Sequence, residues 1–404
     1  MDLTISQTEN SGDNEKQQEN VAIKVINRWD EYDLKTDLLR GIYANGFEEP
    51  SQIQKTAILP IIEKRDLIAQ APSGTGKTGT FTIASLERVD IESNTTQILI
   101  LAPTHELVTQ IAGVVSQISN FMEGLRVKTL IGGTSVTDDA FELRNNVPHV
   151  VVGSVGRVAD MIRRKHIQTR DIKLFVLDEA DEMLSGGFLE NIYNMFPTFH
   201  ENIQVAIFSA TMPGEILGLT EKFMRNPVKI TMEAENLNLE GIKQYYVALS
   251  NDDQKYETIK DLFGKLSVNQ TIIYVNSVNR VIDLYKAMKN DGCAVCCIHS
   301  TMTSQERKET LSEFRRGVHR VLISSNVTAR GIDVQQVSIV INFDVPRCVH
   351  TYLHRIGRSG RWGRKGVAIN FVTRDDIGDM KKIETHYKST IEELPGAFDQ
   401  SLQG

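Results

Sequence analysis

The segment Ala71-Pro-Ser-Gly-Thr-Gly-Lys-Thr78 decides the first half of the fold. It follows an apolar run, 67–70, and precedes a stretch with helical spacing, which is the setting of a phosphate-binding loop. Its glycines let successive backbone N–H groups curl around phosphate oxygens, and the next helix adds the positive end of its dipole. We therefore expect a nucleotide site that is contacted by Ser73, Gly74, Thr75, Gly76, Lys77 and Thr78.

Two side chains of this loop have distinct expected roles. Lys77 is placed to reach the terminal phosphates, and the Thr78 hydroxyl is placed to bind Mg²⁺. The loop departs from the usual pattern, because Ala71 replaces its first glycine and Pro72 has no N–H to donate. The sequence leaves open whether that missing N–H would face a phosphate. A glycine-rich turn with a surface lysine is the alternative interpretation.

A second polar segment, Asp178-Glu-Ala-Asp181, follows the apolar run 174–177. Asp178 ends an expected strand and is a candidate ligand of Mg²⁺, while Glu179 is placed to orient or deprotonate an attacking water. Read alone, the segment also fits an acidic first turn of a helix. Together with the loop at Lys77, it predicts a catalytic nucleoside triphosphatase site.

Short apolar runs alternate with longer amphipathic stretches along the whole chain, which is the pattern of parallel α/β sheets. The expected strands end at Gln70, Ala102, Gly153, Asp178 and Ser209, and in a second series at Val275, Ser324, Asn342 and Val372. The 404 residues thus predict a disordered polar tail (1–21), a first α/β domain (22–232), a short linker (233–242) and a second α/β domain (243–404).

Composition excludes several classes of protein. The net charge of −7 excludes a surface that binds nucleic acid everywhere, so any polyanion must meet a local positive site. We expect an intracellular protein without a membrane span, because no secretory signal or long apolar run is present. The four cysteines predict no disulfide framework. Cys293, Cys296 and Cys297 are interpreted as core thiols, with half a zinc site as the alternative.

The order and spacing of these motifs resemble those of DEAD-box RNA helicases, from about Trp29 to Pro395. The resemblance implies two tandem RecA-like domains, with ATP and Mg²⁺ as cofactors. Within GFEEPSQIQ (46–54), Gln54 takes the position of the glutamine that recognises adenine. Trp29 takes the position of an aromatic residue that stacks on the base, with a plain core anchor as the alternative.

The resemblance also implies roles for residues that no spacing argument reaches. Ser209 and Thr211 would couple hydrolysis to RNA binding, together with Asp181 and His354. In the second domain, Asp333 would hold the ribose, and Arg358 and Arg361 would complete the catalytic centre as arginine fingers.

The RNA-facing positions that the resemblance implies are Pro103, Thr104, Gly132, Gly133, Ser154, Gly156, Arg157 and Arg330. The chain departs from the family at His105, which replaces an arginine, at Ser154-Val155, which replaces Thr-Pro, and at Ser325-Asn326, which replaces Thr-Asp. Since His105 is largely neutral at pH 7, we expect weakened or altered RNA binding.

The expected function is that of an ATP-dependent RNA helicase, which would bind single-stranded RNA between its two domains and unwind short duplexes. Segments such as NLEGIKQYYV (238–247) are similar to the subgroup of translation initiation factor 4A and its exon-junction relatives. That similarity implies translation initiation, a scaffold partner of the initiation factor 4G type, a monomer and the cytoplasm, with the nucleus as alternative. The other function left open is an ATP-gated RNA clamp in splicing or ribosome assembly.

Overall fold

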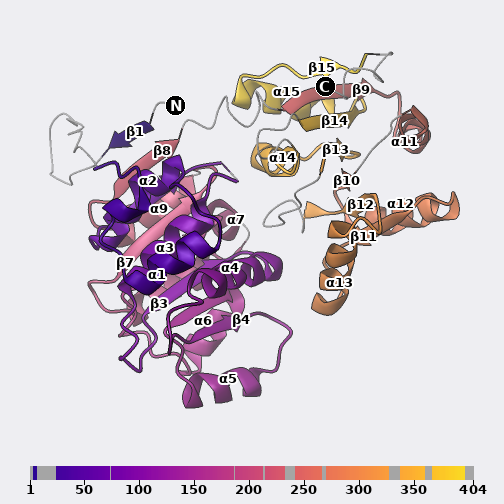
Figure 1. Ribbon diagram of the computed structural model, residues 1–404. Coiled ribbons are helices and arrows are strands. Elements are labelled where there is room, and N and C mark those ends of the chain that lie inside the picture. Colours follow the sequence, from indigo (N-terminus) through magenta and orange to yellow (C-terminus); the bar gives the residue numbers. More distant parts are fainter. Residues whose placement is uncertain are drawn as a thin grey trace. The chain divides into compact units, whose positions relative to one another are not determined.

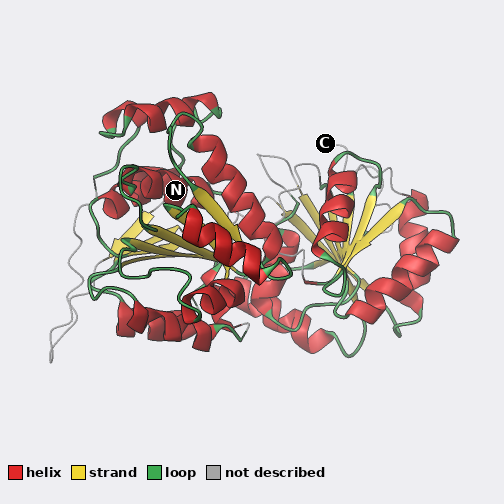
Figure 2. Cartoon of the chain, turned by 90° about the horizontal axis from the view of Figure 1, so that it is seen from below, coloured by secondary structure: helices red, strands yellow, loops and turns green. Residues whose placement is uncertain are grey.

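The computed structural model describes residues 3–6, 24–72, 74–185, 187–212, 214–232, 242–265, 270–326, 337–359 and 366–395. The chain divides into two compact units, Met1–Ala234 and Glu235–Gly404 (Figure 1). In each unit, helices cover both faces of one β-sheet (Figure 2). Each unit is an α/β domain built on one mainly parallel sheet, as the sequence predicts.

The first sheet has the strand order β1-β8-β2-β7-β6-β3-β5-β4. Strand β1 pairs antiparallel with β8, and all other pairs are parallel. Because parallel strands share a direction, the loops at their carboxyl ends gather at one edge. The strands are β1 (Leu3–Ser6), β2 (Leu67–Gln70), β3 (Ile98–Ala102), β4 (Val127–Leu130), β5 (Val150–Ser154), β6 (Leu174–Asp178), β7 (Gln204–Ser209) and β8 (Val228–Met232).

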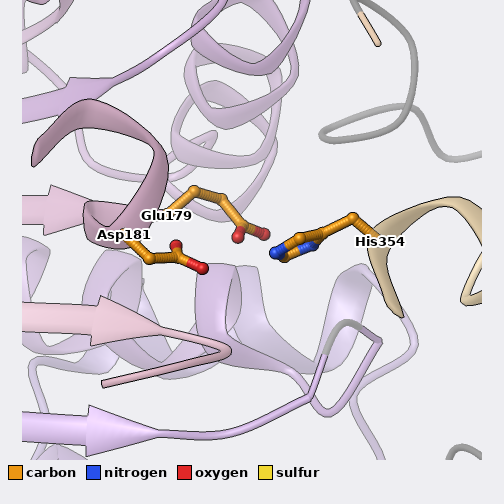
Figure 3. Close-up of side chains that lie close together, drawn as sticks. All are labelled: Glu179, Asp181 and His354. Carbon is orange, nitrogen blue, oxygen red and sulfur yellow. The ribbon is translucent and has the colours of Figure 1, made fainter. Parts of the chain in front are cut away.

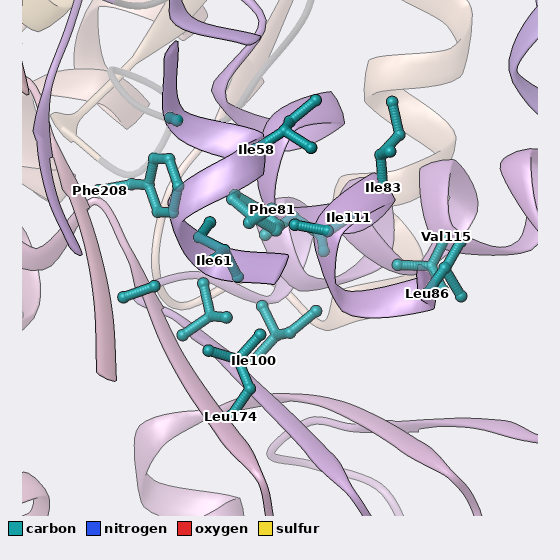
Figure 4. Close-up of a cluster of buried hydrophobic side chains, with 14 of the residues drawn as sticks. Ile58, Ile61, Phe81, Ile83, Leu86, Ile100, Ile111, Val115, Leu174 and Phe208 are labelled. Atoms are coloured by element: carbon teal, nitrogen blue, oxygen red, sulfur yellow. The ribbon is translucent and has the colours of Figure 1, made fainter. Parts of the chain in front are cut away.

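Successive strand residues point to opposite faces, so the first unit has a core on each side of its sheet. In β3, Ile98 and Ile100 enter one core, and Leu99 and Leu101 enter the other. Figure 4 shows Ile100 and helical side chains of the first core. The helices that pack in this first core are α1 (Thr36–Ala44), α2 (Gln52–Ile62), α3 (Lys77–Arg88) and α4 (His105–Ile118). The helices that pack in the core on the other face are α5 (Val136–Asn145), α6 (Val155–Arg163), α7 (Ala180–Ser185), α8 (Leu189–Met195) and α9 (Gly214–Phe223). Two single 3₁₀ turns are η1 (Trp29–Glu31) and η2 (Phe196–Thr198).

The second sheet is parallel throughout, with the strand order β11-β12-β10-β13-β14-β9-β15. Helices α11 and α12 pack on one face, and α13, α14 and α15 pack on the other. The elements are β9 (Ile242–Ala248), α11 (Gln254–Lys265), β10 (Thr271–Tyr274), α12 (Val278–Asn290), β11 (Val295–Ile298), α13 (Ser304–Arg315), β12 (Val321–Ser324), β13 (Ile339–Asn342), α14 (Val349–Ile356), β14 (Gly366–Val372), α15 (Ile377–Tyr387) and β15 (Glu392–Glu393).

All the strands predicted from apolar runs are present, but two other expectations need correction. Leu3–Ser6, in the expected disordered tail, pairs with β8; the rest of that tail lies outside the described residues. Most of the expected linker also lies outside them, but its last residue, Ile242, begins β9. All four cysteines are free; Cys296 is buried as expected, whereas Cys293 is exposed, because it follows the end of α12.

Among the described residues, none of the helices has both the length and the apolar character that crossing a membrane requires.

Candidate ATP and RNA sites

The phosphate-binding loop lies between β2 and α3, where the sequence places it. Gly74 and Gly76 have φ angles of +84° and +101°, in the left-handed region that favours glycine. Gly76 caps α3, and a Cβ added there would lie only 2.7 Å from Ser51 Oγ. The loop is braced internally, since Thr75 Oγ1 donates to Pro72 O at 2.9 Å. The remaining predicted loop residue, Ser73, lies outside the described residues.

Lys77 brings the loop and the acidic segment together. Its side chain is buried, and Nζ donates to Ala71 O at 2.9 Å and lies 3.9 Å from Glu179 Oε1. Thr78 follows in the first turn of α3 and is half-buried. The loop lysine and the carboxylate that is expected to activate water are therefore in contact.

Asp178 and Glu179 are both buried at the carboxyl end of β6. Burial, and secondarily the charge of Glu179, raises the pKa of Asp178, while the nearby Lys77 ammonium acts in the opposite direction. Glu179 has a φ of +53°, an uncommon conformation for a residue with a side chain. Such strain at a carboxylate that faces Lys77 fits a functional position.

Asp181, Ser209 and Thr211 form a connected group in the first unit. Thr211 Oγ1 donates to Asp181 Oδ2 at 2.7 Å, and Thr211 N donates to Ser209 Oγ at 3.3 Å. A carboxylate oxygen of Glu179 lies within 4.8 Å of one of Asp181, and Figure 3 shows both side chains. Since Ala71 N also donates to Ser209 O at 3.0 Å, the end of β7 contacts both the acidic segment and the ATP loop.

The two expected adenine contacts are placed differently from the expectation. The Gln54 side chain is buried: Oε1 accepts from Ser51 N at 2.7 Å, and Nε2 donates to Gly76 O at 3.4 Å, so the amide contacts the ATP loop itself. Trp29 is fully buried in the core, where its ring lies 5.9 Å from that of Tyr32. The structure therefore favours the core anchor, because a covered indole has no face to offer a base.

The predicted RNA-facing residues of the first unit lie at one edge of its sheet. Thr104 caps α4 by accepting from Leu107 N at 3.2 Å, and Gly156 is exposed at the start of α6. The turn at Gly132 and Gly133 follows β4, and Gly133 has a φ of +83°. Two other members lie at this edge: Pro103 directly follows β3, and Ser154 ends β5. Strands β3 and β5 are neighbours in the sheet.

Arg157 differs from the expected phosphate contact. It is buried, and its guanidinium pairs with Asp139 and donates to Thr134 O at 2.8 Å. Asp139 lies 18 residues earlier in the chain, so nothing in the local sequence indicated this pairing.

In the second unit, α14 holds His354, which Figure 3 labels, and Arg358 follows the end of that helix. Both side chains are buried, and Arg358 Nε donates to His354 O at 3.2 Å. Three other predicted site residues, Arg330, Asp333 and Arg361, lie outside the described residues.

Arg355 is a residue that the sequence analysis missed. It is fully buried, and its guanidinium donates to the Oδ1 atoms of Asn276 and Asn326, at 2.7 and 2.6 Å, and to Asp344 O at 2.8 Å. These acceptors follow β10, β12 and β13, so one arginine ties three strand ends to α14. The available signal was an arginine between the apolar residues Leu353 and Ile356.

Comparison with known proteins identifies the family. A profile described as DEAD/DEAH box helicase matches residues 51–218, and one described as helicase conserved C-terminal domain matches residues 254–363. The chain is 51% identical over 372 residues to a Saccharomyces cerevisiae protein named ATP-dependent RNA helicase eIF4A, covering 92% of this chain and 93% of that protein. The chain belongs to the DEAD/DEAH box helicase family.

Two further comparisons support the same family assignment. Eukaryotic initiation factor 4A of Caenorhabditis elegans is 49% identical, with 92% of each chain covered. The solved structure of S. cerevisiae Dbp5 bound to RNA and ADP BeF3 superposes with a TM-score of 0.82 at 34% identity, covering 91% of this chain and 95% of that one. The predicted fold, family and enzyme class, an ATP-dependent RNA helicase, are thereby confirmed.

Proposed function

We propose that this helicase binds ATP with Mg²⁺ and single-stranded RNA, and uses ATP to separate short RNA duplexes during translation initiation. The observation that carries the proposal is the contact of Lys77 with Glu179, because it joins the ATP loop to the carboxylate expected to activate water. Arg358, and with it Arg361 and Asp333, would complete the ATP site from the second unit.

Thr78 and Asp178 would hold Mg²⁺, which neutralises phosphate charge when it is bound. The residues fit a hard cation, because two carboxylates, Asp178 and Glu179, are buried side by side. The raised pKa of Asp178 expresses the cost of charging both groups. A divalent ion would lower that cost and favour the ionised carboxylate.

The edge formed by β3, β5 and β4 would hold the RNA backbone. Ala102 and Ser154 are paired residues at the ends of β3 and β5, so α4 and α6, which cover opposite faces of the sheet, both begin at this edge with their N-terminal N–H groups. A Cβ added at Gly132 would lie 3.2 Å from His105 Nε2, so a larger residue there would crowd the His105 ring at this edge. Backbone donors of this kind recognise phosphate rather than base sequence.

The assignment to translation initiation rests on the identity of 51% to the yeast eIF4A protein. By the same argument the helicase works in the cytoplasm, is monomeric on its own and is stimulated by a scaffold of the initiation factor 4G type. Affinity capture of bound proteins from the native cell tests this assignment, since a translation scaffold and splicing factors differ in composition.

The enzymatic proposal is tested by measuring steady-state ATP turnover with and without RNA, beside strand release from a short duplex. We expect RNA to stimulate turnover and ATP to drive release, and Lys77→Ala to lose both. Stimulated turnover without release would contradict unwinding and favour the ATP-gated clamp.

A further inference from the structure

We propose that Asp139 is a positioning residue for RNA, acting through Arg157, and that Arg157 holds the RNA-facing turn in place instead of binding a phosphate. The inference rests on the proposed RNA edge at β3, β5 and β4. It assigns a role to a carboxylate on α5 and changes the role expected for Arg157.

The guanidinium of Arg157 already binds partners within the first unit. Nη1 pairs with the carboxylate of Asp139, and lies 3.0 Å from Thr134 Oγ1, while Nη2 donates to Thr134 O at 2.8 Å. Arg157 is 9% exposed and Asp139 is 5% exposed, so solvent weakens this pair little. A phosphate would have to compete with a buried carboxylate for the same guanidinium.

Thr134 connects the pair of Arg157 and Asp139 to the RNA-facing turn at Gly132 and Gly133. Its Oγ1 lies 3.0 Å from Ile131 O and 3.0 Å from Asp139 Oδ2, so contacts with Arg157 and Asp139 fix both its side chain and its backbone. Gly133, immediately before it, has a φ of +83°. The network therefore fixes the turn at Gly132 and Gly133, whose backbone would approach the RNA.

The charges in the network balance locally. Lys128 Nζ lies 3.1 Å from Asp139 Oδ1 and also pairs with Glu142, so two carboxylates face the two cations Lys128 and Arg157. Arg157 therefore adds little net positive field at the RNA edge. Removing the carboxylate of Asp139 leaves the cations in excess.

The two roles for Arg157 predict opposite effects for Asp139→Asn. If Arg157 were a phosphate ligand restrained by Asp139, the variant would release it, tighten RNA binding and steepen its salt dependence. If Arg157 positions the turn, the variant weakens RNA binding, since the donors at Gly132 and Gly133 lose their fixed placement. We expect about a tenfold loss of affinity, which is the scale of one charge-assisted contact.

The experiment measures RNA affinity of the full chain, with a non-hydrolysable ATP analogue, at several salt concentrations. Asp139→Asn is expected to weaken binding, and Arg157→Met is expected to weaken it by a similar factor at every salt concentration, because Arg157→Met removes no ion contact with RNA. Arg157→Met would instead reduce the slope of log affinity against log salt by about 0.7 if the guanidinium bound a phosphate, which would overturn the proposal. Wild-type affinity in Asp139→Asn would overturn it as well.

Three further variants separate positioning from general damage to the fold. Asp139→Glu keeps a carboxylate on α5 and is expected to recover most of the lost affinity. The double variant Asp139→Asn/Arg157→Met is expected to be no weaker than the weaker single variant, because both changes disrupt one unit. Asp160→Asn is the matched control, since Asp160 on α6 pairs instead with Arg163 and Arg164 at the C-terminal end of that helix.

Failure of this inference is distinguishable from failure of the proposed function. If the wild-type chain binds no RNA at any salt concentration, the proposed function is wrong. If the wild type binds and the control equals it, additive losses in the double variant, or no recovery in Asp139→Glu, would contradict the positioning role alone.

Discussion

Asn326→Asp should stabilise the second unit, because it places a carboxylate beside the buried guanidinium of Arg355. Asn326 Oδ1 accepts two hydrogen bonds from Arg355, from Nε at 3.0 Å and from Nη2 at 2.6 Å. The other direct acceptors are neutral too: the Oδ1 atoms of Asn276 and Asn342 and the backbone oxygen of Asp344. Burial accordingly lowers the pKa of Arg355 to about 10.

The magnitude follows from those contacts. A hydrogen bond between charged partners contributes more than one to a neutral amide, and two bonds change, so we expect a gain of about 1 to 2 kcal/mol in the free energy of unfolding. Desolvation of the new carboxylate costs little, because residue 326 is exposed. Repulsion from the Asp344 carboxylate is limited, since that group pairs with Lys255 and Arg280.

The stability gained by Asn326→Asp should depend on pH in a definite direction. Arg355 would lower the pKa of the new carboxylate, so the gain is present above the unfolded pKa of about 4 and is lost as the pH falls through the folded value. The assay is urea unfolding at neutral and acidic pH. Because two units can unfold separately, amide hydrogen exchange in α14 is followed by mass spectrometry at each urea concentration.

Asn276→Asp is the matched control for this prediction. Asn276 Oδ1 also accepts from Arg355, but its Nδ2 donates to Val345 O at 2.9 Å, and a carboxylate cannot make that bond. We expect this control to be less stable than the wild type. If Asn326→Asp gave no gain at neutral pH, the charge of Arg355 would already be compensated, and the reasoning would be wrong.

Three further variants test the ATP site. Lys77→Ala should abolish ATP turnover in a phosphate-release assay, because it removes the ammonium that lies near Glu179; retained turnover would contradict its role. Glu179→Gln should bind ATP but not hydrolyse it, so RNA should be retained after ATP is added; release at the wild-type rate would count against it as the base. Asp178 has a raised pKa, so the ligand-free wild type should lose stability as the pH rises from the usual carboxyl range towards neutral. Asp178→Asn should flatten that loss in chemical denaturation; an unchanged profile would show that another group causes it.

Strands with both faces buried were readable from the sequence, and strands with a half-exposed face were not. In β3 and β6 every residue is buried, so each strand appears as a continuous apolar run. Strand β4 lies at the sheet edge, with three of its four residues half-buried, and its sequence VKTL carries no such run. Strand β9 has a similar mixed pattern, and its first residue, Ile242, was assigned to the linker.

In the candidate site too, some features could be located from the sequence and others could not. The sequence located Lys77 and Glu179 because each follows a readable strand within a short motif, and the parallel sheet brings such strand ends to one edge. It did not locate the partners of Arg157 or Arg355, which are set by the fold across distances such as the 79 residues between Arg355 and Asn276. Nor could it show that the Trp29 indole is enclosed by the core.

These buried polar contacts suggest how the helicase keeps its functional loops in register. In the first unit, Thr211 bonds to Asp181, so the ends of β7 and β6 are joined; in the second unit, Arg355 joins the ends of three strands to α14. Asp181, Thr211 and Arg355 are themselves buried, where an unsatisfied polar group is costly, so the connected loops have few alternative arrangements. Residues on such loops are held in place before a ligand arrives, and less ordering remains to oppose binding.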